Sequence, residues 1–343
     1  MEKRNINLDV IRCVALLYIL CVHFFMQAGY YSTVIAGPAL YLGTILRNTF
    51  TACVPLFIIL TGYLMNKKTI SKKYYMGISK VLILYGLSCI PIWIFRAAYL
   101  GETFTVGTML KSLVTYELYA WYVALYVGLY LLIPFLNLIY NNLADRKQKT
   151  LLLLILVFLT ALPSITNIFG FNLIPVFWEE IYPITYYFIG AYLCEYKDEI
   201  KLSTIATLVL YLLVLLVGGT FVYFFVQNRF FYDVGLFVDW GNILNTTSST
   251  LLFLFLLKCD FSRLPKPICK AVETISLVSL QLYLVSWIFD TVVYFRFNMK
   301  YAYFSDKLLL FPIPIAMVFI CSFILAIIIH FVYKGIKKIS AQK

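Results

Sequence analysis

The residues best suited to chemistry lie in the first long apolar run of the chain, which Arg12 and His23 interrupt. His23 follows Arg12 by eleven positions, about three helical turns, so both side chains share one helix face, about 16 Å apart. Ionisable residues within a membrane span are costly and usually functional. An imidazole is suited to taking a proton from a hydroxyl near neutral pH. The pair therefore indicates a general base and a cationic binding group.

A second interpretation of the pair involves no chemistry. Arg12 would reach the cytoplasmic headgroups with its long side chain, and His23 would be a hydrogen-bonded packing residue between helices. Asp9, one turn before Arg12, is placed to pair with it, and Gln27 lies one turn beyond His23. The other histidine, His330, lies at the basic end of the last apolar run, where we interpret it as a membrane-surface residue. The shared stripe favours the functional interpretation for Arg12 and His23.

Three more charged residues are expected near the outer ends of their helices: Arg47, Glu117 and Asp290. A run of polar residues at 245–250 is not expected to face lipid. Together these residues indicate a polar vestibule on the outer side. Each of the three charges is equally compatible with an interfacial position, and the sequence leaves open which of them approaches His23.

The elements that position these residues are membrane spans. Of the 343 residues, 62% are hydrophobic and 13% are charged, about half the charged fraction of soluble domains. Apolar runs of about 20 residues, enough to cross a bilayer core, recur along the whole chain. The first lacks a cleavage site and is expected to be a retained span, not a signal peptide. The runs predict one all-α transmembrane domain over residues 1–343, with about ten spans near 9–28, 42–65, 75–97, 118–140, 150–168, 179–195, 203–226, 243–258, 273–293 and 308–333.

The positive charges are unevenly distributed between the loops. If the N-terminus is cytoplasmic, nineteen lysines and arginines fall on the inner side and seven on the outer side, while Arg12 and Lys80 lie inside helices. The positive-inside rule then predicts that both termini are cytoplasmic. The net charge of +12 reflects this topology and anionic membrane lipids, so no nucleic-acid partner is expected. The eight cysteines lack metal-ligand spacing and are interpreted as packing residues, and no metal site is expected.

Several motifs resemble the acyltransferase family 3 of bacterial membrane proteins, which O-acylate surface and secreted glycans. The segment NLDVIRCVA at 7–15, followed by His23, is similar to the family's LD-x-x-R-x-x-A and histidine, including the ten-residue gap. Arg47, VPLF at 54–57 and TGYL at 61–64 resemble its R, VPLF, SGYL signature, with Thr61 in place of serine. Two later patterns are also similar: Trp121-Tyr122 with Tyr130 and Pro134, and Ser279 with LYL at 282–284.

The sequence departs from the family's pattern at two positions where the family often has a histidine. Tyr119 and Ser286 stand there instead. His23 is therefore the only histidine expected on the outer side. The resemblance nevertheless covers the whole chain, with its motifs in the expected order.

The resemblance implies a multi-pass O-acyltransferase of the bacterial plasma membrane, by default an O-acetyltransferase. Its donor would be cytoplasmic acyl-CoA, acetyl-CoA by default, with no permanently bound cofactor. Its acceptor would be a hydroxyl of an extracytoplasmic or lipid-linked glycan, such as capsular or exopolysaccharide. His23 would act as general base or form an acyl-histidine, Arg12 would bind the nucleotide phosphates, and Arg47 would stabilise the oxyanion. The other residues expected to bind substrate are Asp9, Glu117, Trp121, Tyr122, Lys68, Lys72, Lys73 and Tyr283.

Two other functions remain open on the sequence. A transporter or flippase of a polysaccharide precursor is the alternative, because a polytopic bundle with a polar interior suits both functions. A catalytically silent sensor or scaffold is the third. The stripe of Arg12 and His23 favours the enzyme. Four lysines follow residue 66, at positions 67, 68, 72 and 73, and without a phosphate-bearing ligand they are ordinary positive-inside charge.

Overall fold

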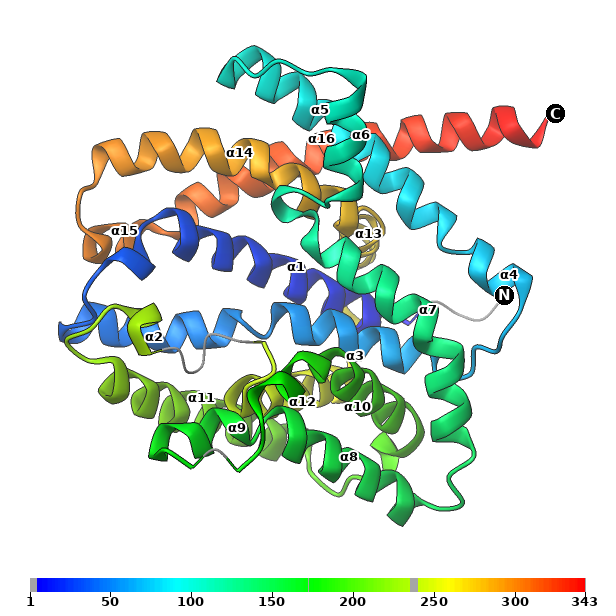
Figure 1. Ribbon diagram of the computed structural model, residues 1–343, viewed down its shortest axis with the longest axis vertical. Coiled ribbons are helices and arrows are strands. Elements are labelled where there is room, and N and C mark those ends of the chain that lie inside the picture. The colour runs from blue at the N-terminus through cyan, green and yellow to red at the C-terminus, as the bar shows by residue number, and fades with distance from the viewer. Residues whose placement is uncertain (1–4, 172, 235–239, 343) are drawn as a thin grey trace.

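The computed structural model describes residues 5–171, 173–234 and 240–342, and Figure 1 shows that they form a bundle of helices. No β-strand occurs within these ranges, in agreement with the predicted all-α fold. A short 3-10 helix, η2, covers Leu118–Ala120 directly before α7. The α-helices are α1 Ile6–Gln27, α2 Gly37–Phe50, α3 Cys53–Met65, α4 Lys72–Met76, α5 Ser79–Leu100, α6 Val106–Val114, α7 Trp121–Asn141, α8 Arg146–Thr160, α9 Pro163–Thr166, α10 Tyr182–Tyr196, α11 Thr204–Val226, α12 Ile243–Lys258, α13 Lys266–Leu277, α14 Ser279–Lys300, α15 Phe304–Leu310 and α16 Pro312–Ala341.

The bundle is polytopic, with fewer full-length spans than the ten predicted. Among the described residues, seven helical stretches are long and apolar enough to cross a membrane, or eight if the bent pair α13 and α14 is one span. The predicted spans at 179–195 and 243–258 correspond to α10, of 15 residues, and α12, of 16 residues. At 1.5 Å per residue both fall short of a bilayer core of about 30 Å. α10 packs against α3, which belongs to the 29-residue stretch Gly37–Met65, and α12 packs against α11, of 23 residues.

The helix α1 lies near the middle of the bundle, between α14 and α16 on one side and α2 and α3 on the other (Figure 1). Its side chains at Ile11, Leu16 and Phe24 are fully buried. Asn5 caps the helix, because its side chain accepts a hydrogen bond from the Asn7 N–H. A residue on α1 can therefore contact side chains from both halves of the sequence.

The helices α3 and α10 touch backbone to backbone at two glycines. A Cβ at Gly62 would lie 1.9 Å from the Tyr187 carbonyl oxygen, and a Cβ at Gly190 would lie 2.0 Å from the Ile59 carbonyl oxygen. A backbone oxygen inside a packed helix cannot move aside, so only glycine fits at either position. The glycine of the TGYL motif thus has a structural role: it fixes the position of α3.

The chain bends by 74° between α13 and α14. Val278 follows the last residue of α13 and precedes Ser279, the first residue of α14. Both helices contact α1. The bend brings α13 against the beginning of α1, where Ser276 contacts Asp9, and α14 against its end, where Asp290 contacts His23.

Candidate active site

His23 on α1 faces a carboxylate from the far end of the sequence. Its Nδ1 lies 3.1 Å from Oδ2 of Asp290 on α14, and Asp290 is fully buried. This approach is within ion-pair distance but off the direction of an ideal hydrogen bond, so the carboxylate acts on the ring chiefly through its charge and proximity. Contact through Nδ1 leaves Nε2 as the ring nitrogen for a substrate. A base that is oriented by a third group is the usual arrangement in acyl transfer.

Tyr119 contacts both members of this pair. Its hydroxyl donates a 2.9 Å hydrogen bond to Oδ2 of Asp290, and its ring stacks on the His23 ring with centroids 3.7 Å apart. The Tyr283 hydroxyl donates in turn to the backbone carbonyl of Tyr119. The neighbouring Leu118 in η2 has a φ of 59°, a strained value that persists where surrounding contacts require it. These contacts fix the orientation of His23.

A small cavity of about 40 Å³ opens beside His23, and we call it the outer cavity. Its exposed end is formed by Met26 and Trp121, and the Trp121 ring stacks on Trp240 with centroids 5.8 Å apart. Its most buried apolar lining lies at the start of α3, and we call this part the closed end. The complete lining is Ile19, Val22, His23, Met26, Cys53, Val54, Trp121, Tyr122, Trp240 and Tyr283.

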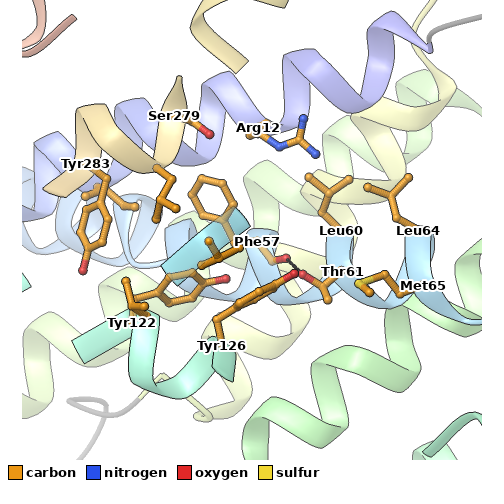
Figure 2. A pocket seen from close by; sticks show the side chains of 14 residues that line it. Arg12, Phe57, Leu60, Thr61, Leu64, Met65, Tyr122, Tyr126, Ser279 and Tyr283 are labelled. Atoms are coloured by element: carbon orange, nitrogen blue, oxygen red, sulfur yellow. Dashed lines mark hydrogen bonds between the residues drawn. The ribbon is translucent and has the colours of Figure 1, made fainter. Parts of the chain in front are cut away.

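A larger cavity of about 230 Å³, the inner cavity, surrounds Arg12 (Figure 2). Arg12, Thr61, Tyr126 and Ser279 give it polar groups from four different helices. The rest of its lining is apolar or aromatic: Ile19, Phe57, Leu60, Leu64, Met65, Val81, Tyr122, Val123, Leu280 and Tyr283. A guanidinium on the wall of an apolar cavity suits a ligand that combines an anionic group with a long, weakly polar arm.

Arg12 is held by a carboxylate and a hydroxyl. Its Nη1 donates to Ser276 Oγ at 2.7 Å and lies 3.4 Å from Asp9 Oδ1. The Ser276 hydroxyl donates to the same Asp9 oxygen at 2.5 Å. Asp9 is buried and lines neither cavity. Its contacts are those of a residue that positions Arg12, not of one that touches a ligand.

Three side chains line both cavities: Ile19, Tyr122 and Tyr283, which we call the partition. The rings of Tyr122 and Tyr283 lie 6.4 Å apart and almost perpendicular, at 89°. In Figure 2 they stand at the end of the inner cavity opposite Leu64 and Met65. A ligand that extends from Arg12 to His23 must pass the partition.

The structure brings most of the predicted site residues to these two cavities. His23 and Trp121 line the outer cavity, Arg12 lines the inner one, and Tyr122 and Tyr283 line both. The predicted lysines Lys68, Lys72 and Lys73 are exposed. They follow closely on Met65, which ends α3 and lines the inner cavity.

Arg47 and Glu117 line neither cavity. The guanidinium carbon of Arg47 lies 4.4 Å from the centroid of the Phe231 ring, and its Nε donates to the Tyr31 hydroxyl. Glu117 accepts a 3.0 Å hydrogen bond from Arg96. Of the three outer charges that the sequence left open, Asp290 is the one in contact with His23.

Sequence reasoning left Asp290 as one of three candidate charges near His23, and it named Tyr119 only as a departure from the family's pattern. One signal was present, because Asp290 follows Tyr283 by seven residues, two helical turns, and so shares its face of α14. Asp290 also lies in the interior of its helix, whereas Glu117 lies outside one. Trp240 lies in a turn between helices, and no sequence pattern pointed to it.

Comparison with known proteins gives one match for this chain. A family model described as an acyltransferase domain, that of acyltransferase family 3, matches residues 5–331. Searches of curated proteins and of solved structures gave no match. The matched range includes both cavities, the partition and the pair of His23 and Asp290. A model that covers nearly the whole chain shows the family, and the chain belongs to the membrane acyltransferases of acyltransferase family 3.

Proposed function

We propose that the protein transfers an acyl group, acetyl by default, from acyl-CoA to a hydroxyl of an extracytoplasmic or lipid-linked glycan. The observation that carries this proposal is the position of His23. Its ring contacts the buried Asp290 carboxylate on one side and lines the outer cavity on the other. The three residues of the partition line both this cavity and the one that contains Arg12. Donor and acceptor can thus approach His23 from opposite ends of α1.

The proposed chemistry uses His23 as a general base. Nε2 takes the proton of the acceptor hydroxyl while its oxygen attacks the thioester carbonyl carbon, and a tetrahedral intermediate forms. The intermediate collapses with cleavage of the carbon–sulfur bond, and the imidazolium returns the proton to the departing CoA thiolate. The products are the acyl ester and CoA. Asp290 stabilises the imidazolium between these steps, and Tyr119 holds the carboxylate in place. Attack by Nε2 itself, which would give an acyl-histidine, is the close variant.

The donor side is assigned to Arg12 and the lysines after α3. A guanidinium held by Ser276 and Asp9 presents a fixed cation to a phosphate group of CoA. The exposed Lys68, Lys72 and Lys73 raise the local concentration of the anionic donor at the same end of the bundle. The inner cavity would hold the pantetheine arm, with the thioester at the partition.

The acceptor side is assigned to the exposed end of the outer cavity. The stacked indoles of Trp121 and Trp240 offer apolar faces to a sugar ring. Arg47 has no part in this scheme, since it packs against Phe231 outside the cavities. The proposed orientation has both termini in the cytoplasm of a bacterial cell. Reporter fusions after residues 143 and 198 should score inside and a fusion after residue 300 outside, and the reverse pattern would refute the orientation.

The test of the proposed function is a transfer assay with the full chain in membranes. Acetyl-CoA labelled in the acetyl group is supplied on one side with surface polysaccharide as acceptor, and label on the glycan is counted. We expect His23→Gln to lower transfer by roughly 10²- to 10⁴-fold, because glutamine keeps hydrogen-bonding capacity but cannot take the proton. His330→Gln is the matched control, because this second buried histidine lines neither cavity and should leave transfer unchanged.

Three results would contradict the proposal. Near-normal transfer by His23→Gln at wild-type expression would make His23 a packing residue. Movement of a glycan precursor across the membrane without acyl transfer would favour the transporter. Equal losses in His23→Gln and His330→Gln would point to a general effect of histidine removal on folding.

A further inference from the structure

We infer that the closed end of the outer cavity restricts the transferred acyl group to two or three carbons, with Val54 as the limiting residue. This inference rests on the proposed function, since it takes His23 as the base that acts at the thioester. The reacting carbonyl carbon must then lie about 3 Å from the acceptor oxygen that His23 activates. The carbonyl and the chain attached to it therefore occupy the outer cavity.

The space beside His23 matches a very short chain. A water-sized group needs roughly 10–15 Å³ of such volume, so a cavity of about 40 Å³ holds about three groups. An acetyl group has three non-hydrogen atoms, a propionyl group four and a butyryl group five. Acetyl fills the cavity, propionyl needs a small adjustment, and butyryl needs room that the cavity does not have.

The two ends of the outer cavity differ in how easily their side chains can move to admit a larger group. Met26 and Trp121, at the exposed end, are 50% and 37% exposed, and this is where an acceptor enters. Cys53 and Val54, which form the closed end, are 0% and 3% exposed and begin α3. A packed interior resists expansion. With the acceptor at the exposed end, the acyl chain is directed toward Cys53 and Val54.

The position of α3 is itself fixed. Gly62 packs against the backbone of α10, so α3 cannot shift away from the cavity to admit a longer chain. Val22 on α1 closes the same space and is also buried. The chain-length limit therefore lies in side-chain volume, which substitution can change without moving a helix.

The experiment compares kcat/KM for acetyl-CoA, propionyl-CoA and butyryl-CoA with one glycan acceptor. For the wild type we expect butyryl transfer to be about 10- to 200-fold slower than acetyl transfer, the usual discrimination of an apolar pocket against excess methylenes. Val54→Ala removes two carbons from the closed end and should raise the butyryl-to-acetyl ratio by about tenfold or more. Val22→Ala enlarges the cavity from α1 and is the second variant, should Val54→Ala fail to fold.

The matched control is Val285→Ala, because Val285 is buried in a separate apolar cluster with Ile92, Ile288 and Ile329 and lines neither cavity. This change should leave the ratio as in the wild type. The inference is overturned if the wild type transfers butyryl as fast as acetyl, or if neither enlarged variant changes the ratio. The proposed function would fail in a different way: no acyl-CoA would label the glycan at any chain length.

Discussion

Each end of α1 carries a functional side chain that is supported by a carboxylate and a hydroxyl, but the supporting groups come from different places. At the inner end, Arg12 is held by the carboxylate of Asp9 and the hydroxyl of Ser276. At the outer end, His23 is held by the carboxylate of Asp290, which in turn accepts from the Tyr119 hydroxyl. The inner carboxylate lies three residues away on the same helix, whereas the outer carboxylate comes from another helix.

This difference reflects how precisely the Arg12 guanidinium and the His23 ring must each be positioned. The guanidinium of Arg12 lines a cavity of about 230 Å³ and needs only to present a charge to a mobile phosphate. The His23 ring lines a cavity of about 40 Å³ and must meet a reacting oxygen within a few tenths of an ångström. At the outer end both the carboxylate and the stacked ring come from outside α1, whereas at the inner end the carboxylate lies on α1 itself and the Ser276 hydroxyl comes from α13. We therefore expect substitutions around His23 to lower kcat. Substitutions around Arg12 should instead raise KM for the acyl donor.

The sharpest way to break this comparison is to exchange the two carboxylates for amides. Asp290→Asn should lower kcat by roughly 10²- to 10⁴-fold, because the imidazolium loses its counter-charge and the ring its orientation. Asp9→Asn is the matched change at the inner end and should raise KM for acyl-CoA with little loss of kcat. Steady-state kinetics with purified protein in lipid discs measure both. An effect of Asp9→Asn on kcat as large as that of Asp290→Asn would remove the distinction between the two ends.

Arg12→Ala tests the inner end directly. Losing a charged donor to phosphate should raise KM for acyl-CoA by about 10- to 100-fold. The KM for the glycan acceptor should change by less than about twofold, because the partition separates Arg12 from the acceptor side. The measurement is a pair of kinetic titrations, one for each substrate. If the acceptor constant alone changed, the proposed direction of donor entry would be wrong.

Tyr119→Phe separates the two contacts of this side chain. Phenylalanine keeps the stack on His23 but cannot donate to Asp290, a hydrogen bond to a carboxylate that is worth about 1.5 kcal/mol. We expect kcat to fall by about tenfold, with both KM values unchanged. Tyr294→Phe is the control, because the buried Tyr294 hydroxyl has no hydrogen-bond partner among the described residues. A full loss of protein from the membrane in Tyr119→Phe alone would assign Tyr119 to folding instead.

The smallest effect is expected for Ser276→Ala. Arg12 would keep Asp9 and lose its 2.7 Å contact with the serine hydroxyl, so KM for acyl-CoA should rise by about three- to fivefold. Ser322→Ala on α16 removes a buried hydroxyl that lines neither cavity and should have no such effect. An unchanged KM in Ser276→Ala would show that Asp9 alone positions Arg12.

The same contrast explains what the sequence predicted. The pairing of Asp9 with Arg12 follows from helical spacing within one turn, and the shared face of Arg12 and His23 follows from the same periodicity. The pairing of His23 with Asp290 depends on how α14 leaves the 74° bend and packs on α1, and no local pattern encodes that angle. Long-range contacts of this kind are fixed by packing.

The predicted spans also divide into those that local sequence identifies and those that depend on packing partners. Apolar runs identified every helix that is long enough to cross a bilayer by itself, because that signal is local. The helices α10 and α12, of 15 and 16 residues, are too short to cross a bilayer by themselves, and each packs against neighbouring helices. For α10 that neighbour is α3, which Gly190 and Gly62 allow to approach to backbone contact.

The partition has a consequence for the energy supply of a cell. An active site that is open to both faces of an energised membrane could let protons through. A continuous water-filled path along α1 would carry protons down their gradient. Each elementary charge that crosses dissipates about 2.3 kcal/mol per 100 mV. Ile19, Tyr122 and Tyr283 interrupt that path with one aliphatic and two aromatic side chains between the cavities. Under the proposed function, the same residues that an acyl donor must pass would limit proton leakage while no substrate is bound.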